Sequence, residues 1–115
     1  MAEEKSISDI VALASAFYDS AVLFSALDNK IFEEIEKAGG EATLKQLAEA
    51  TQNSERGLRL LLDGCVAIGI LKKAGESYSN TQAGKLALVQ GAPADLTRAI
   101  CYNRDVYGAW GKLSQ

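Results

Sequence analysis

The side chains that could carry out chemistry are few, and their types exclude several reactions. The chain contains no histidine, so the commonest general base and the commonest metal ligand are both missing. Its two cysteines, Cys65 and Cys101, lie in apolar patterns with helical spacing and lack a basic neighbour that would activate a thiolate. We therefore predict no catalytic, cofactor-binding or metal site in this chain.

Two clusters of charged residues could form binding sites. Glu33, Glu34 and Glu36 lie in one short segment with helical spacing, and we interpret them as a solvated face, not as paired catalytic carboxylates. The second cluster could contact phosphate groups and consists of Arg56, Arg59, Lys72 and Lys73. Acidic neighbours at helical spacing can pair with the arginines, so we interpret this cluster as solvated surface too.

The composition indicates one acidic domain. With 115 residues and a net charge of −3, the chain is long enough to bury roughly two thirds of its unfolded surface. Residues 1–42 carry nine acids and three bases, whereas residues 43–85 carry four acids and six bases. This basic excess is smaller than a DNA-binding protein normally shows. No secretory signal precedes the cysteines, so we expect reduced thiols and a cytoplasmic location.

Residues 43–67 predict two helices joined by a turn. Thr43 and Gln46 match a capping box, which fixes the start of the first helix. After a polar turn, Ser54 can cap the second helix. The apolar stripe of the second helix is wide enough to centre a small core and comprises Leu58, Leu61, Leu62, Cys65, Val66 and Ile68.

A short hairpin follows these helices. Gly69 can end the second helix, and residues 70–74 and 77–80 flank a turn that contains Gly75. A helix-turn-helix followed by a hairpin is the order of a winged helix. The sequence therefore predicts a mainly α fold with a winged-helix core at residues 42–90.

A long apolar helix precedes this core. Ser6 and Ser8 can cap it, and between Ile10 and Leu27 its single charge is Asp19. We reject a membrane span, because Asp19 would cost about 2.5–3.5 kcal/mol at the bilayer centre. One apolar stripe comprises Ile10, Ala14, Phe17, Ala21 and Phe24, and a second comprises Val11, Tyr18 and Val22. One small domain cannot cover both stripes, so we expect a second copy or a neighbouring domain to do so.

Three further helices complete the predicted chain. Asp28 or Asn29 can cap a short one, and Thr81 can cap another over residues 82–89. The last helix begins at Asp95, and its apolar spacing runs to the final residue without a C-terminal cap. Its apolar side comprises Leu96, Ile100, Asn103, Tyr107 and Trp110. This unfinished pattern predicts a chain cut inside or just after a helix.

Four aromatic side chains could line a pocket for a flat, hydroxylated molecule: Tyr18, Tyr102, Tyr107 and Trp110. Packing in the core or between subunits is the simpler interpretation of each. We keep Tyr18 and Trp110 as the best candidates for an acceptor pocket.

Short segments along almost the whole chain follow one another in a particular order. They are Ala26-Leu27-Asp28-Asn29-Lys30-Ile31-Phe32-Glu33, Thr43-Leu44, Leu47-Ala48, Leu61-Leu62-Asp63, Ile68-Gly69-Ile70-Leu71, Tyr78-Ser79-Asn80-Thr81 and Gly91-Ala92-Pro93. Together they resemble the N-terminal domain of S-adenosylmethionine-dependent O-methyltransferases. The resemblance implies a winged-helix module that binds no DNA, forms an intertwined homodimer and helps to close the pocket of a small-molecule methyl acceptor. It also implies a following Rossmann-like domain that holds S-adenosylmethionine.

One part of that family's pattern is missing from this sequence. No strand leads into an acidic, Gly-rich turn that could cradle the cofactor, and Gly39 and Gly40 lack that context. The resemblance therefore places the cofactor and the catalytic residues beyond Gln115, and this chain would not methylate by itself.

We predict one domain over residues 1–115, with dimerisation helices at residues 6–38 and 94–115. The predicted interface residues are Ile10, Ala14, Phe17, Ala21, Phe24, Ile100, Tyr107 and Trp110. The predicted partners are a second copy and, in the full-length protein, the methyl acceptor, with neither nucleic acid nor membrane. Two alternatives stay open: a free-standing winged-helix transcription regulator that binds DNA, and a protein-interaction adaptor that no feature of the sequence favours.

Overall fold

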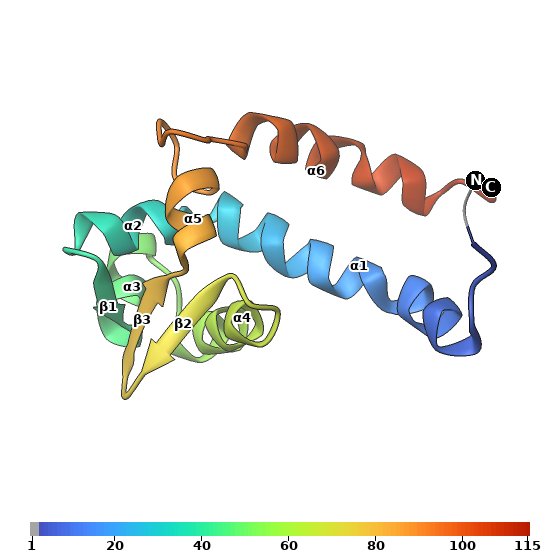
Figure 1. Ribbon diagram of the computed structural model, residues 1–115. Helices are drawn as coiled ribbons and strands as arrows, with labels where there is room; N and C mark the ends of the chain where they lie inside the picture. Colours follow the sequence, from blue (N-terminus) through green and yellow to red (C-terminus); the bar gives the residue numbers. More distant parts are fainter. Residues whose placement is uncertain (1–2) are drawn as a thin grey trace.

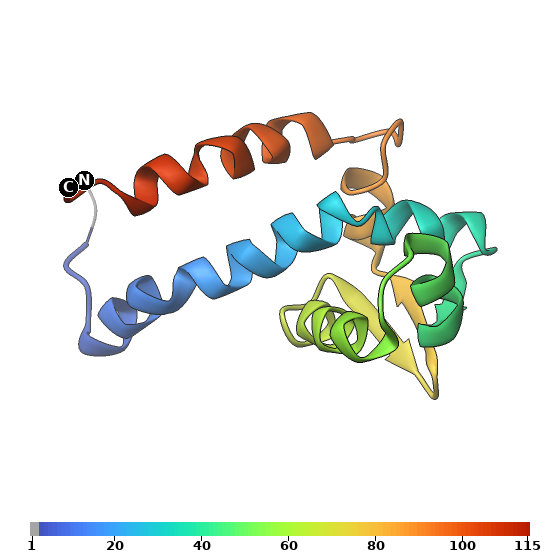
Figure 2. The ribbon, with the colours of Figure 1, turned by 180° about the vertical axis from the view of Figure 1, so that it is seen from behind.

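The computed structural model describes residues 3–115, which form six α-helices and three short β-strands. In chain order these are α1 (Ile7–Asp28), α2 (Ile31–Lys37), β1 (Glu41–Thr43), α3 (Leu44–Thr51), α4 (Glu55–Ala67), β2 (Leu71–Ala74), β3 (Ser77–Asn80), α5 (Gln82–Ala87) and α6 (Thr97–Gly111). A globular body contains α2 to α5 and the strands, and α1 and α6 extend from it side by side (Figure 1 and Figure 2). The molecule is therefore elongated, with principal extents of 45, 29 and 28 Å.

Both helices of the predicted helix-turn-helix begin where the sequence indicates. The Thr43 hydroxyl accepts a hydrogen bond from the Gln46 backbone N–H at 3.2 Å, and the Gln46 side chain accepts one from the Thr43 N–H at 2.8 Å. The Ser54 hydroxyl accepts from the Gly57 N–H at 3.2 Å and caps α4. These caps satisfy donors that a helix start would otherwise leave free.

The predicted hairpin is present, but it belongs to a sheet of three strands in the order β1-β3-β2. β2 and β3 pair antiparallel around a turn in which Gly75 has a φ of 62°. β1 pairs antiparallel with the other edge of β3, and the sequence analysis did not predict it. A strand of three residues is too short to show an alternating pattern. Thr43 also caps α3, so the sequence indicates a helix start there and not the end of a strand.

The core lies where α2, α3 and α4 pack around β3 and the last turns of α1. Its buried apolar residues are Ala26, Leu27, Ile31, Phe32, Ile35, Ala42, Leu47, Ala48, Leu58, Leu62, Cys65, Leu71, Tyr78 and Leu88. Burial raises the pKa of Cys65 to about 12, so this thiol behaves as a small apolar core residue. Cys101 is half-buried on α6.

The predicted cap of α2 is wrong. Neither Asp28 nor Asn29 caps this helix, because the residue before it is Lys30, which has a left-handed backbone (φ 55°) and no capping hydrogen bond. Asn29 instead ends α1, where its side-chain N–H donates to the Ser25 carbonyl at 2.8 Å. Two residues separate α1 from α2, so the chain reverses through Lys30 and leaves no extended residue that could act as a cap.

Several predicted helix ends also need correction. The predicted Ser6 cap of α1 is confirmed, but α5 ends two residues earlier than predicted, and α6 spans Thr97–Gly111 instead of running from Asp95 to the final residue. Asp95 lies outside α6, where its carboxylate accepts hydrogen bonds from the Thr97 N–H (2.8 Å) and hydroxyl (2.6 Å). The Asp95 side chain thereby satisfies backbone donors that α6 leaves free at its start.

A polar network joins the hairpin to α4. The Tyr78 side chain is buried, with 2% of its surface exposed, and its hydroxyl donates to the Asp63 carboxylate at 2.6 Å. The Lys73 ammonium lies 3.5 Å from the same carboxylate and 5.1 Å from the centre of the Tyr78 ring. The hydrogen bond from Tyr78, followed by the charge of Lys73, lowers the pKa of Asp63. The folded state therefore favours the ionised form of Asp63.

We expect Tyr78→Phe to lower the free energy of unfolding by about 1 kcal/mol at pH 7, since it removes one hydrogen bond to a half-exposed carboxylate. Because folding lowers the pKa of Asp63, the decrease in the free energy of unfolding should have its full size above about pH 4. It should shrink as the pH falls through the lowered pKa. Urea unfolding across pH 2–7 measures it, with Tyr102→Phe, at an exposed site on α6, as the control. No loss at any pH would assign Tyr78 a packing role alone, and a loss that does not change with pH would show that the hydroxyl does not favour the ionised form of Asp63.

Candidate subunit interface

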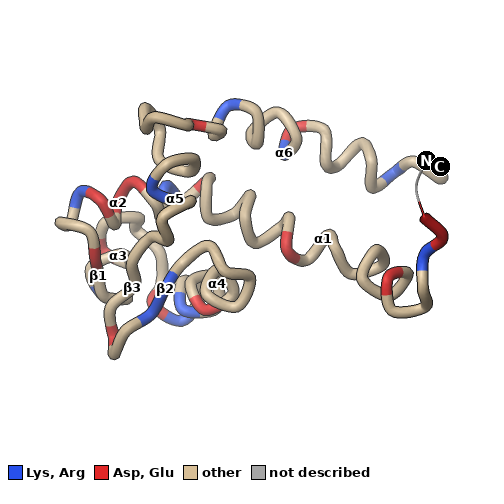
Figure 3. The backbone as a smooth tube through the Cα atoms, viewed as in Figure 1, with Lys and Arg blue, Asp and Glu red and all other residues tan. Residues whose placement is uncertain are grey.

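The outer part of α1, residues 7–19, lies beyond the body and is named the α1 arm. No residue of this arm is even half-buried. The exposed fractions are 84% for Ile7, 65% for Leu13 and 62% for Tyr18. Its charges are Asp9 and Asp19 alone, and Figure 3 shows one acidic position in the middle of α1. Exposing apolar surface to water costs roughly 25 cal/mol per Å², so covering this arm lowers the free energy of the molecule.

The outer part of α6, residues 106–111, is named the α6 arm and runs beside the α1 arm (Figure 1). Trp110 is 65% exposed and Tyr107 39% exposed. At Gly108 and Gly111 a side-chain β-carbon would meet nothing within 4 Å. The α6 arm therefore presents two large rings and two positions with open space around them.

The two arms join the body through contacts at their inner ends. The rings of Phe24 and Tyr107 meet edge to face, with their centres 5.6 Å apart. The Arg104 guanidinium donates hydrogen bonds to the carboxylates of Asp28, at the end of α1, and of Asp105. Asp105 first and Asp28 second raise the pKa of Arg104. These contacts hold α6 against α1 near the body.

The structure divides the predicted interface residues into two groups. Exposed members are Ile10, Ala14, Phe17, Tyr107 and Trp110, and half-buried members are Ala21, Phe24 and Ile100. Phe24 and Tyr107 contact each other within the chain, which leaves less of their surface for a partner. The interface itself stays a prediction.

Sequence reasoning missed other residues of this surface. Ile7 and Leu13 are as exposed as the predicted members, and their place at helical spacing from Ile10 was the signal that could have found them. The pair of Arg104 and Asp28 gave no signal, because the two residues are 76 positions apart.

The two acceptor-pocket candidates lie on different arms. Tyr18 is on the α1 arm, where its ring lies 4.2 Å from the ring of Phe17, centre to centre. Trp110 is on the α6 arm and is equally exposed. Both rings are therefore exposed and available to a further surface.

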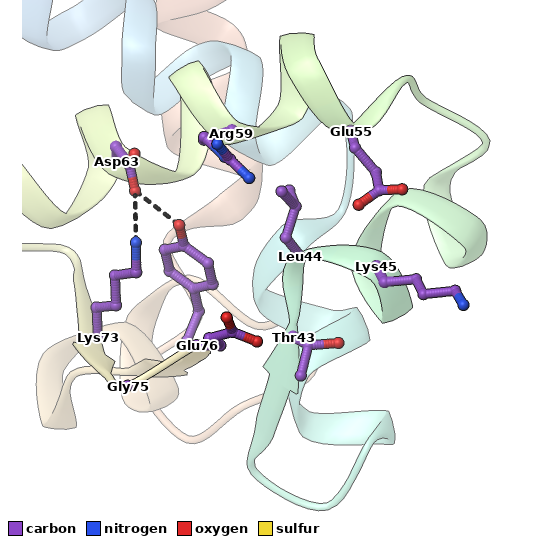
Figure 4. Close-up of a pocket in the computed structure, with 10 residues that line it drawn as sticks. Thr43, Leu44, Lys45, Glu55, Arg59, Asp63, Lys73, Gly75 and Glu76 are labelled. Atoms are coloured by element: carbon purple, nitrogen blue, oxygen red, sulfur yellow. Dashed lines mark hydrogen bonds and ion pairs between the residues drawn. The ribbon is translucent and has the colours of Figure 1, made fainter.

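The cationic cluster lies beside a groove between α3, α4 and the hairpin, with a volume of about 630 Å³ (Figure 4). The charged lining residues are Lys45, Arg59 and Lys73 with Glu55, Asp63 and Glu76. Three bases and three acids leave no excess of positive charge to attract phosphate. The groove lining is therefore balanced in charge, and the other two members of the cluster, Arg56 and Lys72, are exposed and do not line it.

Within residues 3–115, no three His, Cys, Asp or Glu side chains are arranged to hold a metal ion. α1 is long and apolar enough to cross a membrane, with a mean hydropathy of 1.8 over 18 residues, of which 6% are buried. A helix that a partner subunit covers has the same properties. The hydropathy of α1 therefore does not contradict the prediction that a protein surface covers this helix.

Residues 11–90 match the sequence model of the O-methyltransferase dimerisation domain. The match covers most of the chain and includes α1 from Val11 onward together with the whole body. The chain belongs to this family. The α1 arm, from Val11 onward, thus lies in a domain that is named for joining subunits, whereas the α6 arm lies outside the matched residues.

Similar proteins include a rat acetylserotonin O-methyltransferase, 36% identical over 91% of this chain and 24% of that protein. A tetracenomycin polyketide synthesis 8-O-methyl transferase from Streptomyces glaucescens is 32% identical over 93% of this chain and 32% of that protein. The crystal structure of human N-acetylserotonin methyltransferase in complex with SAM superposes with a TM-score of 0.82 and 27% identity. It is matched over 99% of this chain and 35% of its own. The chain thus spans about a quarter to a third of its relatives.

We expect Arg104→Ala to loosen α6, because it removes the hydrogen bonds to Asp28 and Asp105 at the inner end of the helix. Trp110 is the only tryptophan and reports on the α6 arm. Its time-resolved fluorescence anisotropy should show a larger fast component in the variant. Arg98→Ala, on the exposed side of the same helix, is the control. An Arg104→Ala protein with unchanged anisotropy would show that the Phe24 and Tyr107 contact holds α6 without the arginine.

Proposed function

We propose that this chain is the dimerisation part of an S-adenosylmethionine-dependent O-methyltransferase, and that its two arms form the contact between the subunits of a homodimer. The observation that carries the proposal is the α1 arm, in which thirteen consecutive residues are exposed although most are apolar. A monomeric soluble protein rarely leaves such a surface open. Covering the large apolar side chains with a second copy would stabilise the pair by roughly 1.5–3 kcal/mol for each one fully buried.

The body serves in this proposal as a winged helix that does not read DNA. α3 and α4 form the helix-turn-helix, β2 and β3 form the wing, and β1 extends the sheet on its other side. The equal numbers of acids and bases around the groove support this role, since DNA binding needs an excess of cations. The body then acts as a support that fixes the inner end of α1.

The relatives suggest a small, hydroxylated aromatic methyl acceptor for the whole protein. We propose that Tyr18 and Trp110 contribute rings to the acceptor pocket once the partner subunit and a catalytic domain enclose them. Residues 3–115 do not suit the cofactor, because their strands pair antiparallel and none leads through a Gly-rich turn into a helix. S-adenosylmethionine would therefore bind to a domain outside this chain. As a separate part of the proposal, the whole protein is cytoplasmic.

We expect Phe17→Asp to convert the dimer into monomers, because it places a charge in the middle of the exposed apolar side of the α1 arm. Light scattering coupled to size exclusion measures the change. Leu60→Asp is the matched control, since Leu60 is 74% exposed on α4 and belongs to neither arm. The proposal predicts dimers for Leu60→Asp and monomers for Phe17→Asp. Dimers for both variants would remove the α1 arm from the interface.

A measurement of the intact mass of the natural polypeptide that carries this sequence tests the proposal that it is a methyltransferase. Because the chain spans 24–32% of its curated relatives, we expect a polypeptide about three to four times as long. The added segment should contain a strand that runs into an acidic, Gly-rich turn. A polypeptide that stops at Gln115 would contradict the proposed parent enzyme, and DNA binding at low salt would become the next experiment.

A further inference from the structure

The two arms have little tertiary support within a single chain: the α1 arm is exposed throughout, and the α6 arm is held at its inner end by Val106, which is half-buried, and by Tyr107, whose ring meets that of Phe24. The α1 arm spans thirteen residues, and the first half-buried residue that follows it is Ser20. Inward of this point the helix is firmly held, with Ala26 and Leu27 in the core. The same helix therefore has an anchored inner end and an outer part in which every residue is exposed.

Local interactions support the outer parts weakly. A capping box at Ser6 and Asp9 stabilises the start of α1. The α1 arm contains no basic residue, so no ion pair between successive turns can form in it. Isolated helices shorter than about 12–15 residues are marginal in water. The α6 arm is weaker still, because Gly108 and Gly111 are poor helix formers.

We propose that the α1 arm and the α6 arm are stably helical only when a second copy of the chain covers them, so that subunit association and folding of the arms are one equilibrium. The choice of a second copy as the covering partner rests on the proposed function and on the family match, which begins inside the α1 arm at Val11. The body, which has its own core and capped helices, stays folded when the subunits separate.

This coupling has a consequence for the strength of the dimer. Association must order about twenty residues as well as bury their side chains, and ordering opposes binding. The dimer should therefore dissociate more readily than its apolar surface alone suggests. Changes that favour helix in the arms should strengthen it without adding any contact between subunits.

Hydrogen exchange measured by mass spectrometry tests the proposal on the chain at concentrations well above and well below its dissociation midpoint. In the dimer, amides of both arms should exchange at least about 100-fold more slowly than in an unstructured peptide. In the monomer they should exchange within about tenfold of the unstructured rate, while α3 and α4 keep their protection. Arms that stay equally protected in the monomer would overturn the proposal.

Two variants separate the proposal from its assumptions. Phe17→Asp supplies a monomer at any concentration and should show fast exchange in both arms with an unchanged body. Gly108→Ala meets no neighbouring atom, so it changes helix propensity alone and should slow exchange of the α6 arm by up to about fivefold in the Phe17→Asp background. Strong protection of the α6 arm in Phe17→Asp before this second change would contradict marginal helix formation there.

Failure of the proposed function gives a different result. If the chain never dimerises, its mass stays that of one copy at every concentration and no dimer state exists to compare. If it dimerises with arms that were already protected in the monomer, the proposed function survives and the coupling of folding to association is wrong.

Discussion

Apolar surface on the first helix must be covered, and the rest of the structure depends on that need. The helix bears large apolar side chains over more than half of its circumference, and the body of the chain covers only its last two turns. Burial of such surface is the dominant favourable term in protein association. A monomer would leave this surface in water, so the composition of one helix favours the association that we propose.

The body supplies the rigid end against which this helix is held. Capped helices, a three-stranded sheet and the network of Tyr78, Asp63 and Lys73 fix the position of α4, and α4 packs on the inner end of α1. α4 and α1 lie close together at Gly64, where a β-carbon would make an ordinary van der Waals contact, at 3.5 Å, with the Val22 side chain. Arg104 then sets the direction of α6 relative to α1. The two arms therefore project from a defined base, although each is free along most of its length.

The sequence predicted most of this architecture because local signals carry it. Thr43, Ser54 and Thr81 mark helix starts that the structure confirms, and apolar spacing identifies the side of α4 that faces the core. The missed features depend on contacts between distant segments. β1 forms because β3 offers an edge, Lys30 adopts a left-handed backbone because two helices meet there, and Arg104 finds Asp28 across 76 residues. The candidate interface could be placed on two helices from sequence, but Phe24 and Tyr107 showed their mutual contact only in three dimensions.

Sedimentation equilibrium of the unmodified chain over a wide range of concentrations tests the central claim most directly. If the arms are a subunit interface, the mass should rise with concentration from 12.2 kDa, the mass of one chain, to twice that value and then stop. A plateau at two copies would show a closed, symmetric contact. A mass that stays at 12.2 kDa throughout, or one that keeps increasing without a plateau, would contradict the account of the arms as the contact of a homodimer.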